Sequence, residues 1–527
     1  MELLRADAIP QWYNAVNILE ANLPQRAEQI ALYSEAGELS FGAVAREVNR
    51  VGHALLHSGV RFGDCVGILA PDSAEWVTTF FGSIKIGAVA LGLNTQLKPA
   101  EYAHILRDSR ARVLVVHASL LELIAPLRDQ LTMLQQVIVI GAAQPGADWT
   151  FADWLAAQPT ELDAAATHRD DFCSLHYSSG TTGQPKGMFH AHKDYPLIAQ
   201  NSGVNLFGLT AADRTFSAAK LFFVYGLGGN LIMPWAVGAS TVLYAGSSRS
   251  AGGMLELMAR FRPTVCFSVP VAYLTMLTLG EIATRYDLAS LRLCLSAGEV
   301  LPAPIWAAWK AATGLEILDT VGCSESLHTF LANRPHDLRP GSSGKPSPGY
   351  AARVVDAAGN PVPPGVLGHL LVKGETMALF YLHQSELSRQ TFRGEWLFTG
   401  DMYTVDSDGF YWHAGRSDDL FKVGGIWVAP TAVESVLMSH PAVVECAVVG
   451  DTDQHGLVKP RALIRLAEGL MLTNDLLRQL LQHCAARLSP HECPRWLDVV
   501  TELPRTATGK VQRYKLRADA TAQKAAR

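Results

Sequence analysis

One short segment of the sequence carries residue types suited to binding an anion. Residues 177–187 read YSSGTTGQPKG and follow an apolar stretch, DFCSLHY, that predicts a strand. Glycines lack a Cβ atom, so backbone N–H groups can approach a ligand closely, and the neighbouring hydroxyls add hydrogen-bond partners. A lysine near the end adds a point charge suited to phosphate oxygens. The segment predicts a phosphate-binding loop with these ligand-facing positions: Ser178, Ser179, Gly180, Thr181, Thr182 and Lys186.

This loop differs from the Walker A pattern. That pattern needs glycine at the position that Pro185 holds, and Ser or Thr at the position of Gly187. A surface turn rich in small polar residues is the alternative interpretation. The length of the string and its Pro-Lys-Gly end favour the phosphate loop.

The elements that must position this loop predict an α/β fold. Short apolar runs alternate with amphipathic stretches from about Asp64 onward, and Ser73 after the run CVGILAP predicts a helix cap. This rhythm is typical of parallel-rich sheets that are buried on both faces. A Gly/Pro/Ser-rich stretch at residues 339–350 introduces a β-rich subdomain, and after Arg416 the pattern changes to a small α+β unit.

The composition raises the question of a membrane protein, and the sequence answers it. The chain has 527 residues, of which 18% are charged, and a mean hydropathy of +0.12, whereas typical soluble domains have roughly 25% charged residues. The apolar stretch at residues 231–245 is shorter than the roughly 20 residues of a membrane helix and contains Pro234 and Gly238. The N-terminus lacks the pattern of a signal peptide. We therefore expect a cytoplasmic protein with a large core and no membrane span.

The charge balance and the cysteines disfavour further classes. The net charge is -5 and no block of Lys and Arg stands out, so a nucleic-acid partner is not expected. The eight cysteines form no CxxC pair, which argues against zinc and dithiol redox motifs. We expect reduced thiols that pack as small apolar groups.

Several motifs together resemble one enzyme superfamily. The string YSSGTTGQPKG is similar to the signature of the adenylate-forming superfamily, which holds acyl- and aryl-CoA ligases, luciferases and the adenylation domains of peptide synthetases. AAKLFFVYGLGG at residues 218–229, SAGEVLP at 296–302 and CSESLHTFLANRP at 323–335 resemble the benzoate-CoA ligases within it. The resemblance extends over nearly the whole chain and implies ATP, Mg²⁺ and coenzyme A.

The resemblance implies a nucleotide site assembled from separate segments. Four consecutive residues would border the adenine ring: Ser296, Ala297, Gly298 and Glu299. Asp319 would form another wall of that pocket. Ser324 would contact the α-phosphate and Glu325 would hold Mg²⁺, which prefers one or two carboxylates together with phosphate oxygens. Asp401 would accept the ribose hydroxyls, with Arg416 as the basic partner of ribose and phosphate.

The resemblance also implies two domains that reorient between half-reactions. Residues 1–417 would form the N-terminal domain with the ATP and acid sites, and residues 418–527 a small mobile domain. Asp418 matches the hinge position, and Lys510 matches the catalytic lysine that touches the carboxylate and the α-phosphate. Gly425 matches a glycine beside the pantetheine arm of CoA, and an ordinary turn glycine is an equal alternative.

An apolar slot for the acid is expected where bulky residues precede close glycines. By the resemblance, Phe223 gates the thiolation channel, and the aryl site is lined by Val224, Tyr225, Gly226, His328 and Thr329. Members that activate amino acids place an Asp in this segment, and residues 220–230 contain none. An uncharged aromatic acid is therefore favoured. The alternatives are a buried strand with core aromatics and, for His328, a satisfied core histidine.

These inferences predict a two-step ligase that forms an aryl-adenylate and then an aryl-CoA thioester, releasing pyrophosphate and AMP. Benzoate, aminobenzoates, hydroxybenzoates and halobenzoates all remain open as substrates. One alternative keeps the first step and loads an acyl-carrier protein as the partner. Another is a non-catalytic nucleotide-binding homologue, and the retained charges of Lys510, Glu325 and Asp401 argue against it. A luciferase-like oxygenase is less favoured.

Replacing Lys510 with alanine tests the role that the resemblance implies. The lysine would stabilise negative charge at a pentavalent phosphorus, and removing such a group typically costs on the order of 2.7–4 kcal/mol, or about 10²–10³ in rate. Pyrophosphate exchange with benzoate measures this half-reaction. An unchanged exchange rate in K510A would overturn the assigned role.

Overall fold

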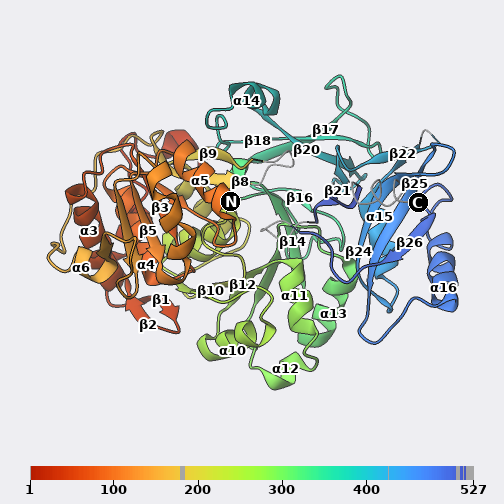
Figure 1. Cartoon of the computed structure of the whole chain (residues 1–527), viewed down its shortest axis with the longest axis horizontal. Coiled ribbons are helices and arrows are strands. Elements are labelled where there is room, and N and C mark those ends of the chain that lie inside the picture. The colour runs from red at the N-terminus through yellow and green to blue at the C-terminus, as the bar shows by residue number, and fades with distance from the viewer. Residues whose placement is uncertain (1, 179–183, 425, 506–510, 514, 518–527) are drawn as a thin grey trace.

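Two large sheets form the main part of the chain, and their strands follow from the apolar runs of the sequence. The computed structural model describes residues 2–178, 184–424, 426–505, 511–513 and 515–517 (Figure 1). Strand β3 (Cys65–Leu69) is buried along its whole length, as expected for a parallel strand covered on both faces. The predicted α/β fold with parallel-rich sheets is confirmed.

The first sheet carries the phosphate loop at one edge. Its seven strands have the order β7-β6-β5-β3-β4-β8-β9, and all neighbours are parallel except β8 and β9. The strands other than β3 are β4 (Val89–Gly92), β5 (Val113–His117), β6 (Gln136–Ile140), β7 (Trp149–Thr150), β8 (Phe172–Ser178) and β9 (Lys186–Ala191). The predicted loop therefore connects an antiparallel pair, with Ser178 at the end of β8 and Lys186 at the start of β9.

The second sheet has nine strands in the order β16-β15-β14-β13-β12-β10-β11-β1-β2. The six strands from β14 to β1 are parallel, whereas both edges are antiparallel. The strands are β1 (Ile30–Ser34), β2 (Gly37–Ser40), β10 (Arg214–Ser217), β11 (Ser240–Val242), β12 (Val265–Ser268), β13 (Leu293–Ser296), β14 (Ile317–Gly322), β15 (Thr329–Ala332) and β16 (Lys345–Pro346).

Smaller sheets follow after residue 350, where the sequence predicted a β-rich region and then an α+β unit. An antiparallel sheet holds β17 (Tyr350–Val355), β18 (Gly368–Gly374), β19 (Phe392–Arg393), β20 (Trp396–Val405) and β21 (Tyr411–Arg416). A hairpin, β22 (Phe421–Val423) and β23 (Ile426–Val428), precedes a three-stranded sheet of β24 (Val443–Thr452), β25 (Val458–Leu466) and β26 (Trp496–Val499). In Figure 1 this last part (blue) lies at the opposite end from the first sheet (red to yellow).

The helices cover the faces of these sheets. They are α1 (Asn17–Glu20), α2 (Leu23–Arg26), α3 (Phe41–His57), α4 (Ala74–Lys85), α5 (Pro99–Asp108), α6 (Phe151–Leu155), α7 (Asp194–Ile198), α8 (Val224–Leu227), α9 (Met233–Ala236), α10 (Ala251–Phe261), α11 (Pro270–Leu277), α12 (Ile282–Arg285), α13 (Ala303–Thr313), α14 (Ser385–Thr391), α15 (Pro430–Met438) and α16 (Asn474–Ala485). As predicted, Ser73 caps α4. Pro99 begins α5, and Thr473 caps α16.

A continuous apolar core joins the two large sheets. Phe81 of α4 stacks on Trp235 of α9 with ring centroids 5.4 Å apart, and both belong to a cluster that includes Val66 of the first sheet and Phe267 of the second. The cysteines are free, as predicted, and most are buried. Among the described residues, no helix is long and apolar enough to cross a membrane. The cytoplasmic location stays a prediction.

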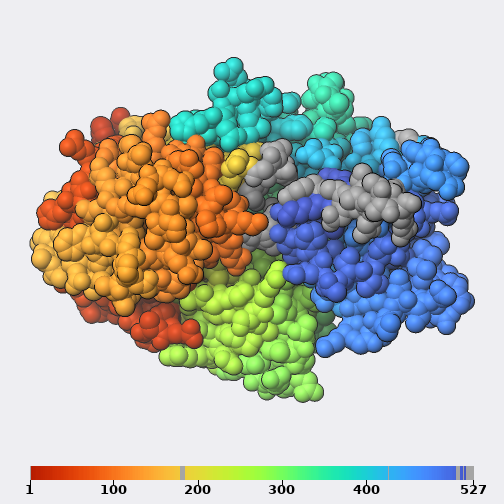
Figure 2. Space-filling model, in the orientation of Figure 1, coloured from red at the N-terminus to blue at the C-terminus, as the bar shows by residue number. Residues whose placement is uncertain are grey.

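The space-filling view shows how the parts meet. In Figure 2 the C-terminal part (blue) lies against the segment that contains the middle strands of the second sheet (green). Arg505 and Glu299 form an ion pair of 3.3 Å across this contact, and Arg249 lies 3.8 Å from Glu502. The boundary at residue 418 between two domains stays a prediction.

A buried carboxylate ties together the starts of β10, β12 and β13, and its pKa makes the stability of the fold depend on pH. Asp213 accepts from both Arg292 Nε (2.8 Å) and Arg292 Nη2 (2.9 Å), and from the Thr264 hydroxyl. Burial alone would raise the pKa of Asp213, but these hydrogen bonds outweigh it and lower the pKa to about 2. The ionised carboxylate therefore stabilises the fold above pH 4, and this contribution is lost as the pH falls toward 2.

We predict that Asp213→Asn lowers the free energy of unfolding by about 1–2 kcal/mol at pH 7 and by less at pH 3. Urea unfolding at both pH values measures the difference, with the exposed Asp163→Asn as the control. The same loss at pH 3 as at pH 7 would show that the charge of Asp213 is not the cause.

Candidate active site

Buried polar groups without partners line up at the carboxyl edge of the second sheet. Ser268, Ser296 and Asp319 are register partners on β12, β13 and β14, and each is at most 3% exposed. Within the described part of the chain, the hydroxyls of both serines and Oδ1 of Asp319 have no hydrogen-bond partner. Such groups cost free energy unless a ligand or water meets them. Ligands of open α/β sheets bind at this edge.

The two predicted phosphate and metal residues lie in a turn at the same edge. Ser324 and Glu325 belong to a short 3₁₀ turn (Ser324–Ser326) that joins β14 to β15. The turn contacts the first sheet, because Nε2 of His190 on β9 lies 2.8 Å from the Ser324 carbonyl oxygen. Nδ1 of the same ring lies 3.1 Å from Asp194.

Lys186 and Glu325 lie around one tyrosine. The Tyr381 hydroxyl donates to Glu325 Oε1 at 2.6 Å, and Lys186 Nζ lies 5.4 Å from the centroid of the tyrosine ring. Burial lowers the pKa of Lys186, whereas the charges of Glu325 and Asp418 act in the opposite direction. Three predicted site residues from distant segments thus lie in one region: Lys186, Glu325 and Asp418. Tyr381 itself was missed, because a tyrosine within the apolar run MALFYL carries no distinctive signal.

The two predicted ribose residues pair with each other. Asp401 on β20 and Arg416 on β21 are register partners, and Arg416 Nη1 lies 3.2 Å from Asp401 Oδ1. The same nitrogen donates to the Thr399 carbonyl at 2.7 Å. Arg416 also lowers the pKa of Lys186 through its charge, which places both cations in one region. The pair is partly exposed, so it can reach a ligand.

The predicted aryl residues form an aromatic group over β12. The rings of Tyr225 and His328 stack with centroids 5.5 Å apart, and Phe267 meets Tyr225 edge-on at 5.8 Å. Burial lowers the pKa of His328 to about 4, so the ring is neutral at pH 7. Among the described residues, neither His328 nitrogen, nor the hydroxyl of Tyr225, nor that of Thr329 has a hydrogen-bond partner. The role of His328 at the acid site stays a prediction.

Glycines of the GLGG segment allow this close packing. A Cβ atom on Gly228 would lie 2.5 Å from His328 Cδ2, and one on Gly229 would lie 2.5 Å from Phe267. A Cβ on Gly226 would lie 2.3 Å from a backbone carbonyl. The segment is helical at residues 224–227 and continues as a π-helical turn (Gly228–Ile232). The alternative of a buried strand is therefore wrong.

The remaining predicted residues lie around this centre. Phe223 precedes α8 and meets Phe222 edge-on at 4.6 Å, and Val224 is half-buried against the core. Ala297 is buried, and Gly298 has a left-handed backbone with φ of 90°. Phe207 and Phe267, whose rings meet edge-on at 5.8 Å, were not predicted as part of the aromatic group. The following predicted positions lie outside the described residues: Ser179, Gly180, Thr181, Thr182, Gly425 and Lys510.

Two family models match most of the chain. A family model described as AMP-binding enzyme matches residues 19–382, and the AMP-binding enzyme C-terminal domain matches residues 432–510. The chain is 42% identical over 513 residues to the benzoate–CoA ligase of Thauera aromatica, covering 97% of this chain and 96% of that protein.

Two solved structures extend the likeness to the fold. The crystal structure of the anthranilate CoA ligase AuaEII in complex with anthranoyl-AMP matches with a TM-score of 0.96 and 55% identity, covering 99% of this chain and all of that one. A benzoate CoA ligase from Burkholderia xenovorans LB400 matches with a TM-score of 0.88 and 37% identity, over 96% of this chain and 100% of that chain.

The fold, the site and these matches define the class of protein: the chain belongs to the AMP-binding enzyme family. Within that family it is an AMP-forming acid–thiol ligase, and the predicted closeness to the benzoate- and aryl-CoA ligases is confirmed. ATP and CoA are accordingly its substrates.

Gly228→Ala tests the packing of the aromatic group. Because the new Cβ would displace His328, we predict that the KM for the aromatic acid rises about tenfold, with a loss of about 1–3 kcal/mol in the free energy of unfolding. The matched control is Gly252→Ala in α10, where the nearest atom would lie 3.8 Å away, and where alanine stabilises a helix by about 0.5–1 kcal/mol. The KM is measured by steady-state kinetics with varied acid. Equal KM values for G228A and the wild type would contradict the assignment of the aromatic group to the acid site.

Proposed function

We propose that this chain joins a benzoate that carries a small polar ring substituent, with 2-aminobenzoate as the preferred acid, to coenzyme A. The observation that carries the proposal is the stacked Tyr225 and His328 pair, whose polar atoms have no partner among the described residues. A flat apolar slot suits an aromatic ring, and unpaired polar atoms favour a substituent that forms hydrogen bonds. The anthranoyl-AMP in the structure of the 55% identical ligase supports this choice.

In the first step, a carboxylate oxygen of the acid attacks the α-phosphorus of ATP, and pyrophosphate leaves. Lys186 supplies a cation for the phosphates, and Ser324 lies at the turn where the α-phosphate would lie. Asp401 and Arg416 hold the ribose, and Asp319 with the segment 296–299 borders the adenine. Lys510 stabilises the charge that develops at phosphorus. These groups position the reactants and stabilise charge, and none of them forms a covalent bond to substrate.

Glu325 fits a magnesium ion held jointly with ATP. Its Oε1 accepts from Tyr381, which leaves the second oxygen for a ligand. Among the described residues, no three His, Cys, Asp or Glu side chains converge as a metal cage. That pattern suits Mg²⁺, which takes one or two carboxylates and otherwise keeps phosphate oxygens and water. When bound, the ion would neutralise charge on the phosphates.

In the second step, the CoA thiolate attacks the carbonyl carbon of the adenylate, and AMP leaves with the bridging oxygen. We propose that residues 418–527 reorient about Asp418 before this step, which brings Gly425 beside the pantetheine arm. Support comes from the exposed position of Asp418 and from the link between the C-terminal part and the second sheet through the Arg505–Glu299 ion pair. Such a pair is partly exposed and can break at modest cost.

An acid panel tests the substrate class. We predict that AMP release with CoA is faster, in kcat/KM, for 2-aminobenzoate than for benzoate by about 10–200-fold, and that α-amino acids give none. Release of AMP with fatty acids at a higher kcat/KM than with any benzoate would contradict the proposal.

The acceptor is tested separately. We expect thioester formation with free CoA at the full rate of adenylate formation, measured with the same acid. A higher kcat/KM with a panel of phosphopantetheinylated carrier proteins than with CoA would favour the carrier-loading alternative.

A further inference from the structure

One segment of the chain touches the candidate metal carboxylate, the phosphate-loop strand and helix α5. The segment comprises residues 378–383. At its start, the Ala378 N–H donates to the Glu325 carbonyl at 2.7 Å. Further along, Tyr381 pairs with Met188 of β9, and the Leu382 N–H donates to the Gly187 carbonyl at 2.7 Å. We call residues 378–383 the bridging segment.

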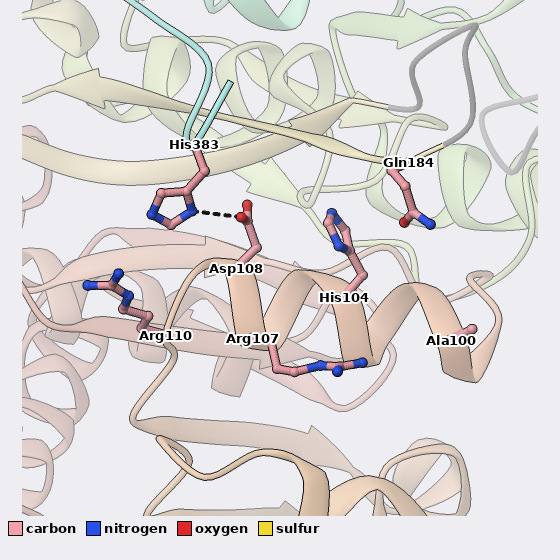
Figure 3. Close-up of a pocket in the computed structure, with 7 residues that line it drawn as sticks. All are labelled: Ala100, His104, Arg107, Asp108, Arg110, Gln184 and His383. Atoms are coloured by element: carbon pink, nitrogen blue, oxygen red, sulfur yellow. Dashed lines mark hydrogen bonds and ion pairs between the residues drawn. The ribbon is translucent and has the colours of Figure 1, made fainter. Parts of the chain in front are cut away.

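The far end of the bridging segment is anchored on α5. Figure 3 shows His383 directed at Asp108, and Nδ1 of the ring lies 2.8 Å from Oδ1 of the carboxylate. Oδ2 of Asp108 accepts from the Tyr177 hydroxyl at 2.6 Å, at the end of β8. His383 has φ of 55°, a left-handed conformation that is uncommon for residues with a side chain. The contacts therefore hold a strained backbone in a defined position.

At the centre of the segment, Tyr381 stands between two opposite charges. The side chain is 5% exposed, its hydroxyl donates to Glu325 Oε1, and its ring faces Lys186 Nζ. In the described structure Lys186 forms no ion pair with Glu325 within 4.0 Å, and its Nζ lies over the Tyr381 ring instead.

We propose that Tyr381 is a positioning residue that separates Glu325 from Lys186 and aims the second carboxylate oxygen of Glu325 at the cation of the bound nucleotide. The inference rests on the proposed role of Glu325. Without the hydroxyl, the carboxylate turns toward the lysine, and both charges lose their interaction with the nucleotide. A phenylalanine ring at position 381 would fill the same space as the tyrosine ring. The expected loss of nucleotide interaction therefore comes from the missing hydroxyl oxygen.

Manganese binding in the presence of ATP and without any acid tests this proposal directly. Mn²⁺ binds the same kinds of oxygen ligands as Mg²⁺. Electron paramagnetic resonance measures the concentration of unbound Mn²⁺. We expect Tyr381→Phe to raise the dissociation constant of Mn²⁺ about tenfold, as for a lost hydrogen bond to a charged group. Tyr102→Phe is the matched control. Tyr102 lies on α5, and its buried hydroxyl donates to the Asn94 carbonyl at 2.8 Å. Y102F should bind Mn²⁺ like the wild type.

A double-mutant cycle separates positioning from general structure. If Tyr381 acts through Glu325, Y381F has no further effect in the Glu325→Gln background. Equal Mn²⁺ affinity of Y381F and the wild type, a full effect of Y381F in the E325Q background, or wild-type affinity of E325Q would each overturn the proposal. A wild-type protein that binds Mn²⁺ and ATP but releases no AMP with any aromatic acid would contradict the proposed function and leave this inference standing.

Discussion

The contact between His190 and the carbonyl of Ser324 is the interaction on which the site depends. The phosphate loop belongs to the first sheet, whereas Glu325, Asp319 and the aromatic group belong to the second. Catalysis by positioning requires these groups to face one ligand with a precision of a fraction of an ångström. A fully buried ring between Asp194 and the Ser324 turn supplies a rigid link, and the bridging segment adds a second one from Glu325 to β9.

The electrostatics of the site follow from how few charges surround it. The chain carries a net charge of -5, so it does not attract nucleotides as a whole. Lys186 and Arg416 instead gather where the two sheets and the β20–β21 pair meet, and the charge of Arg416 lowers the pKa of Lys186. The neutral His328 of the aromatic group follows the Ser324–Ser326 turn that carries Glu325. The reacting carboxylate of the acid would thus pass from an apolar slot to a positive region.

The sequence predicted much of this arrangement because the elements involved carry local signals. Fully apolar runs predicted the parallel strands, Ser73 predicted a helix start, and the Ser324–Glu325 pair was found in a motif. His190, Phe267 and Tyr381 were not predicted. Their roles arise from contacts across long separations in the chain, such as the 56 residues between Tyr381 and Glu325, and their types are ordinary for buried positions. The helical form of residues 224–227 was missed because bulky residues before glycines fit a strand equally well.

The proposed first step requires that a carboxylate oxygen of the aromatic acid attacks the α-phosphorus of ATP at the junction of the two sheets. The most direct measurement uses 2-aminobenzoate labelled with ¹⁸O in both carboxylate oxygens, with ATP, Mg²⁺ and CoA, and analyses the AMP by mass spectrometry. We expect one ¹⁸O atom in each AMP and none in pyrophosphate, because the bridging oxygen stays on phosphorus when the thiolate displaces AMP. Unlabelled AMP, or label in pyrophosphate, would contradict it.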